Sequence, residues 1–368
     1  MKKIIVAPDS FKGAVSSKKA CDIMAEALEK CGCFEVVKMP LADGGEGTLD
    51  IVSSLDGSTV KTVEVFDPLG RAVNAEYIIN KKTAIIESAR ACGLTLLLPE
   101  ERNPLFTTTY GVGQLVSAAL SEDINEIVIT LGGSSTNDCG AGFLAALGAK
   151  FTGENISRIP CGKDLGSITD INLDGLDKRL KNVRLTAVCD VENPLYGKNG
   201  AAYVFAPQKG ADEKTVEILD EGLKRFSDII KKKTGADISF VNGAGASGGL
   251  AAALILLGAE IKKGAETVLS IVGFDSALIS ADYVFTGEGS FDRQSFMGKT
   301  VGTVYAHSRK KNVPVAVFAG EAENDGLPDG IKAVSINPEG ASLKEAMENT
   351  EANLYNAVIK FVNKEKLK

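Results

Sequence analysis

The chain has 368 residues, of which 44% are hydrophobic and 24% are charged, and its formal net charge is −7. This length predicts two domains whose cores need no disulfide or metal, and the acidic charge argues against nucleic acid or an anionic membrane as a partner. The apolar run at the N-terminus is too short for a signal peptide, and no stretch of about 18 apolar residues follows, so we expect a cytoplasmic protein without a membrane span.

Cysteine and histidine offer little for catalysis. The seven cysteines contain no CxxC pair, and we expect buried or inert thiols in a reducing cytoplasm. His307 is the single histidine, so a Ser–His–Asp hydrolase or a multi-histidine metal site would depend on it alone. The 39 glycines are clustered, and these clusters are the candidate functional sites.

The first part of the chain predicts the start of an α/β layer. A β-branched run at 3–7 favours a buried parallel strand, a helix with one apolar face begins near Ser16, and 35–39 predicts the next strand. From 60 to 87 the pattern alternates between turns, which predicts an antiparallel meander. We therefore expect a domain boundary near residue 58.

The middle of the chain predicts further strands and helices of ordinary length. They are strands at 127–131 and 183–188 and helices at 108–120, 141–147, 213–232, 247–257 and 264–271. The C-terminal part again shows the alternation of short apolar strands and helices that is seen in the opening segment. It predicts strands at 283–285, 315–318 and 333–334, and helices at 300–310 and from Ser342.

Because both ends of the chain show this alternation of strands and helices, the sequence predicts an α/β fold with two domains. A Rossmann-like parallel-sheet domain would be built from both termini, 1–58 and 283–368, and a mixed α/β domain with the antiparallel meander would be inserted at 59–282. We expect the active site in the cleft between them.

Two polar clusters follow the first two predicted strands, where open α/β sheets place ligands. The first is APDSFKG at 7–13, and the second is ADGGEGT at 42–48, whose glycines allow close approach of the backbone to a ligand. The alternatives are a polar loop and a sharp strand-to-helix turn. The side chains that favour a site for a small anion are Asp9, Ser10, Lys12, Asp43 and Glu46.

Three further clusters lie in the middle of the chain. GGSSTNDCGAG at 132–142 joins a strand to a helix and is the strongest phosphate-binding candidate, with a structural turn as the alternative. In CDVENPL at 189–195, Asp190 and Asn193 could hold a metal ion or a hydroxyl, or form an Asx-turn. GAGASG at 243–248 matches GxGxxG but lacks the acid-ending strand about 20 residues on, so we expect a phosphate-facing or close-packed turn rather than dinucleotide binding.

The last cluster, TGEGSFDRQS from Thr286, precedes a GKT that resembles a P-loop ending. Arg293 stands where that motif requires glycine, so the P-loop is excluded. Glu288 and Asp292 could serve a magnesium ion or a proton transfer, and Lys299 could reach a phosphate; a salt-bridged loop is the alternative. Glycine, carboxylate, hydroxyl and lysine without nearby histidine favour phosphoryl transfer over hydride or acyl transfer.

At these residues the sequence resembles the bacterial glycerate kinase type I family. The resemblance spans nearly the whole chain, in the family's order, and implies an ATP-dependent kinase of D-glycerate that uses Mg²⁺ and yields 2-phosphoglycerate rather than 3-phosphoglycerate. The alternatives are a kinase of another small sugar acid and a non-catalytic protein that binds a nucleotide or phosphometabolite. The blocks that carry it are APDSFKG, ADGGEGT, ERNPLFTTTYGVG from Glu101, GGSSTND, CDVENPL and GEGSFDRQS.

The resemblance also implies roles for single residues. The implied catalytic residues are Asp190, Asp292, Lys12 and Glu288, with Asp190 and Glu288 also as magnesium ligands. The implied substrate-binding residues are Asp9, Ser10, Lys12, Asp43, Glu46, Asn193, Gln294 and Ser295. The implied nucleotide-binding residues are Gly132, Gly133, Ser134, Ser135, Asn137, Asp138 and Lys299. We expect in-line transfer, with Asp190 or Asp292 taking the proton of a glycerate hydroxyl.

The chain departs from the family's pattern in places. Cys139 stands where a second glycine is usual, and Ser290 stands where a basic residue often does. Arg90 and Glu321 replace small residues and could alter the charge of the pocket, which leaves the hydroxy-acid specificity open. A monomer and a homodimer are both compatible with the sequence.

Overall fold

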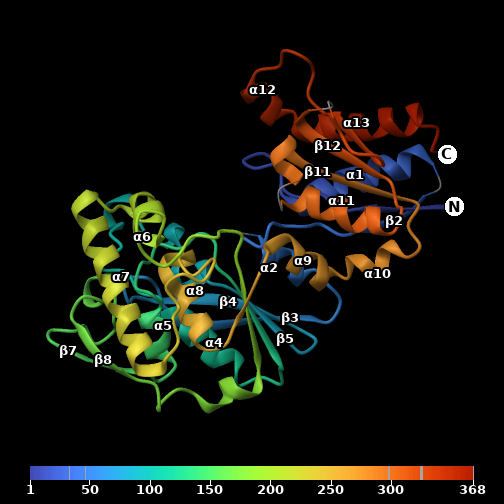
Figure 1. Ribbon diagram of the computed structural model, residues 1–368. Coiled ribbons are helices and arrows are strands. Elements are labelled where there is room, and N and C mark those ends of the chain that lie inside the picture. Colours follow the sequence, from blue (N-terminus) through green and yellow to red (C-terminus); the bar gives the residue numbers. More distant parts are fainter. Residues whose placement is uncertain (33, 46, 297–298, 324–325, 368) are drawn as a thin grey trace. The chain divides into compact units, whose positions relative to one another are not determined.

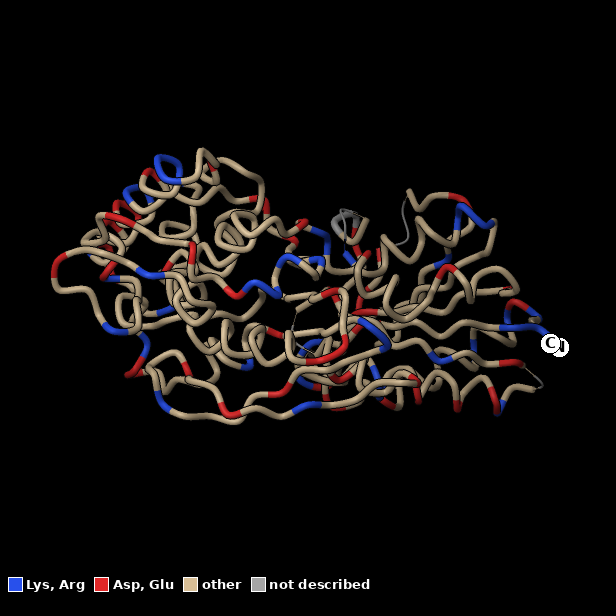
Figure 2. The backbone as a smooth tube through the Cα atoms, turned by 90° about the horizontal axis from the view of Figure 1, so that it is seen from below, with Lys and Arg blue, Asp and Glu red and all other residues tan. Residues whose placement is uncertain are grey.

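The computed structural model describes residues 1–32, 34–45, 47–296, 299–323 and 326–367. Contacts divide the chain into two compact units: unit 1 comprises Met1–Asp43 and Gly264–Lys368, and unit 2 comprises Gly44–Lys263. Both chain ends therefore lie in unit 1 (Figure 1). Acidic and basic residues are interspersed along both units (Figure 2).

Unit 1 is built on a five-stranded sheet in the order β13-β12-β11-β1-β2, with all neighbouring strands parallel. Successive side chains alternate between its faces: Ile4 and Val6 belong to one core and Ile5 to the other. This is the pattern of a strand buried on both sides. The strands are β1 (Lys2–Val6), β2 (Phe34–Lys38), β11 (Tyr283–Phe291), β12 (Val315–Ala322) and β13 (Ile331–Ser335).

Helices cover both faces of this sheet. Leu28 and Phe361, from α1 and α13, pack into one core, and Phe274 and Val304, from α10 and α11, pack into the other. The sheet is therefore doubly covered, as the sequence predicted for a Rossmann-like layer. The helices are α1 (Ser17–Cys31), α9 (Gly264–Val272), α10 (Phe274–Leu278), α11 (Thr300–Lys310), α12 (Leu343–Glu348) and α13 (Thr350–Lys364).

Unit 2 contains a mixed six-stranded sheet in the order β10-β9-β6-β5-β4-β3. Strands β3, β4 and β5 form the predicted antiparallel meander, and β5, β6, β9 and β10 are parallel. The two sheets together confirm the predicted α/β class. The strands are β3 (Ser58–Phe66), β4 (Ala72–Asn80), β5 (Thr83–Glu87), β6 (Glu126–Thr130), β9 (Arg184–Val188) and β10 (Glu260–Lys262), with β7 (Lys150–Gly153) and β8 (Ile168–Asn172) as a separate pair.

One large core joins the helices of unit 2 to its sheet. The helices are α2 (Thr48–Ser53), α3 (Ala89–Cys92), α4 (Tyr110–Ala119), α5 (Ala141–Ala146), α6 (Ala201–Phe205), α7 (Glu213–Thr234) and α8 (Ala246–Leu256). Within the described part of the chain, none of the helices is long and apolar enough to cross a membrane.

The division of the chain differs from the predicted boundaries near residues 58 and 283. The contacts place it after Asp43 and after Lys263. Helix α2 packs on β3, β4 and β5 of unit 2, whereas α10 contributes Phe274 to a core of unit 1. A helix belongs to the sheet on which it packs, and the helix's own sequence pattern does not state which sheet that is.

Strand β11 is longer than the predicted segment 283–285. It pairs with β12 as far as Phe291 opposite Ala322, so the strand continues through the glycine-rich stretch. Glu288 therefore lies within the strand, opposite Ala319, rather than in the loop that follows it.

Candidate functional site

The carboxyl ends of the parallel strands in unit 1 lie at one edge of the sheet, where open α/β sheets bind ligands. A cavity of about 460 Å³ is found there, and cavities of this size hold small molecules. Asp9 follows β1, Asp43 lies beyond β2, Glu288 stands in β11 and Asn337 follows β13. The other polar residues of the lining are Ser10, Lys12, Ser290, Lys299 and Thr300.

Asp9 is held firmly at this edge. Its Oδ2 accepts a hydrogen bond from the Thr300 hydroxyl at 2.6 Å, and its Oδ1 accepts one from the Ser10 amide at 2.6 Å. Burial raises the pKa of Asp9 although these hydrogen bonds lower it, and the neighbouring Asp43 charge raises it further. In the sequence, Thr300 stands only at the end of the excluded P-loop pattern, and no local motif predicts that its hydroxyl orients Asp9.

Glu288 is the second half-buried carboxylate of the cavity. Its Oε1 is buried without a hydrogen-bond partner. Burial raises the pKa of Glu288, and the Asp9 and Asp292 charges add to that effect, against the Ser295 hydrogen bond and Lys299. A buried carboxylate oxygen without a partner is costly, so this position calls for a proton, a cation or a donating hydroxyl from a ligand.

The magnesium ion that the resemblance implies can be tested against these residues. Asp9, Asp43 and Glu288 line one cavity, and Glu288 Oε1 is an orphaned buried oxygen, which is the hard oxygen chemistry that Mg²⁺ prefers. Among the described residues no group of three or more His, Cys, Asp or Glu forms a complete metal cage. Magnesium is commonly held by one or two carboxylates together with substrate phosphates, so these residues fit a metal that arrives with a nucleotide.

The lysines and the segment after β11 complete this edge. Lys12 is 88% exposed, and its Nζ lies 4.0 Å from Asp43 Oδ2; Lys299 is also exposed, at the N-terminus of α11. Asp292 Oδ1 accepts a hydrogen bond from the Ser295 amide at 3.1 Å, which closes the turn there.

Two predicted substrate-binding residues have no described side chain. Glu46 lies outside the described residues. Gln294 lies in the short 3-10 helix Arg293–Phe296, and the structure describes its backbone alone.

In unit 2 the predicted glycine clusters converge. The loop after β6 meets the 243–249 turn, where the Cys139 amide donates a hydrogen bond to the Gly248 carbonyl at 3.0 Å. The same turn meets the segment after β9, where the Gly245 amide donates to the Asn193 carbonyl at 3.0 Å. Segments far apart in the sequence therefore meet near the carboxyl ends of β6 and β9, the ligand-binding edge of a parallel sheet.

Asp138 and Ser135 shape the loop after β6. The Asp138 carboxylate accepts hydrogen bonds from the Thr109 amide and hydroxyl, both at 2.8 Å, and from the Gly140 and Gly142 amides, both at 3.1 Å. Burial raises its pKa although these hydrogen bonds lower it. The Ser135 hydroxyl donates to a backbone carbonyl at 3.0 Å. The nucleotide contacts predicted for both residues stay predictions.

Asp190 and Asn193 follow β9 in unit 2. Asp190 is exposed, and the Asn193 side-chain amide donates to the Asn199 carbonyl at 2.8 Å. Asp190 and Glu288, the two predicted magnesium ligands, belong to different units, so neither unit holds both of them.

The structure shows the surroundings of three residues that depart from the family's pattern. Arg90 pairs with Glu87 at 3.2 Å and with Asp50 at 3.6 Å, which balances its charge inside unit 2. Glu321 is exposed on β12. Cys139 has φ +51°, in the left-handed region that favours glycine, which explains why a glycine suits this position better.

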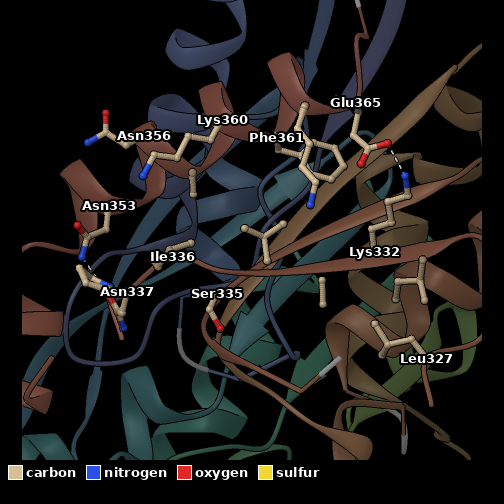
Figure 3. A pocket seen from close by; sticks show the side chains of 16 residues that line it. Leu327, Lys332, Ser335, Ile336, Asn337, Asn353, Asn356, Lys360, Phe361 and Glu365 are labelled. Atoms are coloured by element: carbon tan, nitrogen blue, oxygen red, sulfur yellow. Dashed lines mark hydrogen bonds and ion pairs between the residues drawn. The ribbon is translucent and has the colours of Figure 1, made fainter. Parts of the chain in front are cut away.

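A second cavity of about 750 Å³ lies between β13 and α13 of unit 1. Figure 3 shows its polar contacts: the Asn353 amide donates to Asn337 at 3.1 Å, and Lys332 pairs with Glu365. Its charged lining consists of lysines and this paired glutamate. The carboxylates that phosphoryl transfer needs line the smaller cavity instead.

Comparisons with known proteins show the family to which the chain belongs. The model of the glycerate kinase family matches residues 4–364. The glycerate kinase of Bacillus subtilis (strain 168) is 42% identical over 94% of this chain and 93% of its own, and the glycerate 2-kinase of Escherichia coli (strain K12) is 41% identical over 96% of each. A solved structure described as a glycerate kinase 2 of Salmonella typhimurium LT2 superposes with a TM-score of 0.88 at 36% identity, covering 100% of this chain and 98% of that one. The chain therefore belongs to the glycerate kinase family, which makes it an ATP-dependent phosphotransferase and confirms the resemblance seen in its sequence blocks.

Proposed function

We propose that the protein transfers the γ-phosphate of ATP to a hydroxyl of D-glycerate and yields 2-phosphoglycerate. The observation that carries the proposal is the unit 1 cavity, where the half-buried carboxylates Asp9 and Glu288 stand together with Lys12 and Lys299. Carboxylates can accept the proton of an alcohol, and lysines can offset phosphoryl charge. The relative that is named a glycerate 2-kinase supports the choice of product.

Glu288 is our choice for the group that accepts the proton of the attacking hydroxyl. Its Oε1 has no protein partner, so it is free to accept a hydrogen bond from a substrate hydroxyl. Its raised pKa makes it a stronger base than an ordinary glutamate. Asp190 and Asp292, the bases predicted from the sequence, stay predictions.

The other groups of the cavity would position the reactants. Asp9 is fixed by Thr300 and Ser10, and together with Asp43 it offers carboxylate oxygens to Mg²⁺. When bound, Mg²⁺ would offset the charge on the phosphate oxygens. Lys12 and Lys299 carry flexible ammonium groups that can follow the transferring phosphoryl group.

The loop Gly132–Asn137 of unit 2 is our candidate for the nucleotide phosphates. Gly132 and Gly133 are exposed at its tip, and glycines let backbone N–H groups approach phosphate oxygens closely. The single active site between the domains that the sequence predicts stays a prediction, as do the cytoplasmic location and the absence of a nucleic-acid partner.

An ADP-release assay with ATP, Mg²⁺ and D-glycerate tests the proposal, with L-glycerate and tartronate as parallel substrates. We expect turnover with D-glycerate and a phosphorus NMR signal of 2-phosphoglycerate. A signal of 3-phosphoglycerate would contradict the choice of hydroxyl. Turnover with another hydroxy acid alone would favour a kinase of a different sugar acid and would make Arg90 and Glu321 the first residues to revert.

A further inference from the structure

Lys209 is a buried cation that sequence analysis did not single out. Among the residues that the structure describes, it is the one lysine or arginine that is buried, with 2% of its surface exposed. It ends the short 3-10 helix Pro207–Lys209, which directly follows α6 in unit 2. Because burying an ammonium group costs free energy unless hydrogen bonds or charges compensate it, this placement needs a physical explanation.

The ammonium group lies directly behind the loop after β6. Lys209 Nζ donates hydrogen bonds to Ser134 Oγ at 3.0 Å and to the Thr136 carbonyl at 2.7 Å. Since Ser134 Oγ accepts from the ammonium group, the hydroxyl's own hydrogen must point elsewhere. The contact with Lys209 therefore favours the Ser134 hydroxyl as a donor to a further acceptor at the loop.

The backbone of the loop also leaves hydrogen-bond donors without a partner among the described residues. The Gly133 carbonyl accepts from the Leu94 amide at 2.8 Å, so the Gly133 and Thr136 carbonyls are both used inside the protein. Among the hydrogen bonds of the described residues, none uses the amides of Gly132, Gly133 or Ser134 as donors. An exposed turn with free N–H groups and inward carbonyls attracts anions.

The surroundings of this loop are strained and polar. Asn137 is fully buried, and neither polar atom of its side chain has a partner; the buried Ser247 hydroxyl has none either. Ser247 also has φ +52°, a conformation that side chains rarely adopt. Orphaned polar groups and strained backbone cluster at ligand-binding sites.

We propose that Lys209 is a positioning residue for nucleotide binding: it commits the Ser134 hydroxyl to donate to a phosphate oxygen held by the Gly132–Ser134 turn. This inference rests on the proposed nucleotide role of that loop. The phosphate would gain the hydroxyl, the backbone donors and a buried positive charge behind them, in surroundings that screen charge weakly.

The titration of Lys209 gives this role a distinct signature. Burial lowers its pKa to about 8, while Cys92 and Asp138 beside it act in the opposite direction. An anion bound to the loop would raise this pKa again. The protein would therefore take up protons when it binds ADP near pH 8, and its affinity for ADP would fall as the pH rises through the pKa of the free protein.

Calorimetric titration of the full chain with ADP and Mg²⁺ tests the proposal. We expect the variants Lys209→Met and Ser134→Ala each to weaken ADP binding at least about tenfold. Because Lys209 acts through Ser134, the double variant should bind nearly as well as Lys209→Met alone. The matched control is Lys233→Met, which removes an exposed lysine paired with Asp170 in the same unit and should leave the affinity unchanged.

Repeating the titration near pH 8 in buffers of different ionisation enthalpy measures the protons taken up. We expect uptake in the wild-type protein and none in Lys209→Met. Unchanged ADP affinity in both variants, additive effects in the double variant, or equal uptake with and without Lys209 would each overturn the inference. If Lys209→Met does not fold, Ser134→Ala and the wild-type uptake decide the matter.

Two further outcomes separate this inference from the proposed function. If the wild-type protein binds ADP through Lys209 and Ser134 but does not turn over D-glycerate, the proposed function fails and the inference stands. If the variants lose affinity for D-glycerate alone, the loop binds the acid's carboxylate, and the nucleotide role of Lys209 is wrong.

Discussion

Two half-buried carboxylates with raised pKa values, Asp9 and Glu288, distinguish the unit 1 cavity at the scale of single residues. Glu288→Gln keeps the volume of the side chain and removes the base. We expect kcat to fall by a factor of about 10² to 10⁴, the usual contribution of a general base. ADP release under saturating substrates measures kcat.

The same variant also tests the electrostatics of the site. A carboxyl whose pKa is raised on folding destabilises the folded protein once it ionises, so stability is lost as the pH rises through that pKa. Glu288→Gln should therefore gain thermal stability over the wild type at pH 8 and lose that advantage at pH 4. Glu348→Gln, at an exposed position of α12, is the control; turnover of Glu288→Gln near the wild-type rate would remove Glu288 from the chemistry.

Local motifs identified much of the cavity lining, and tertiary contacts supplied what they missed. Asp9, Ser10 and Lys12 stand in one short block after a strand, so position and chemistry could be read together. Lys209 meets Ser134 across 75 residues of sequence, and no local pattern contains that contact.

At the scale of secondary-structure elements, His307 connects three helices of unit 1. It lies in α11, and its ring nitrogens meet Asp275 of α10 at 2.6 Å and Glu266 of α9 at 2.9 Å. Burial lowers its pKa, but the hydrogen bonds to the two carboxylates outweigh that effect, so the pKa lies above its ordinary value of 6.5. The sequence identifies His307 only as the single histidine of the chain, and no local pattern contains this link between three helices.

This arrangement predicts a pH-dependent contribution to stability. Because the folded pKa is raised, the stabilisation is complete below the unfolded value of 6.5 and is lost as the pH rises through the folded value. We expect His307→Gln to lower Tm more at pH 6 than at pH 9, measured by thermal unfolding. Arg309→Gln, an exposed neighbour on α11, should show no such difference, and an equal loss for His307→Gln at both pH values would contradict the role.

The packing of the 243–249 turn on the loop after β6 can be tested with two glycines. A Cβ at Gly248 would lie 2.0 Å from the Thr136 carbonyl oxygen, whereas one at Gly258 would meet nothing within 4 Å, and both residues have positive φ. Gly258→Ala should cost about 1 kcal/mol from its backbone alone. Gly248→Ala should cost about 1 to 3 kcal/mol more from overpacking.

Urea unfolding of both alanine variants gives this difference directly. Equal losses would mean that the two segments pack less tightly than the structure shows. The sequence contains both glycine clusters, and its pattern is compatible with a 243–248 turn that faces a phosphate or one that packs closely. The tight contact at Gly248 favours close packing, which a single segment's pattern cannot decide.

At the scale of the whole molecule, the chain leaves unit 1 at Asp43 and returns to it at Gly264. The sequence predicts one domain built from both chain ends, because each end carries the apolar runs of buried strands in a parallel sheet. The order of these strands, β13-β12-β11-β1-β2, could not be predicted, since it depends on which helices pack on which face.

Unit 2 is one continuous segment with its own sheet and core, so we expect residues 44–263 to fold when produced alone. The fragment contains Lys209 and the 132–137 loop but neither Asp9 nor Glu288. It should therefore unfold cooperatively on heating and bind ADP with Mg²⁺, yet release no ADP from ATP in the presence of D-glycerate. Circular dichroism, calorimetry and the coupled assay measure these properties. A folded fragment that does not bind ADP would mean that nucleotide binding requires residues of unit 1, and the assignment of the phosphates to unit 2 would be wrong.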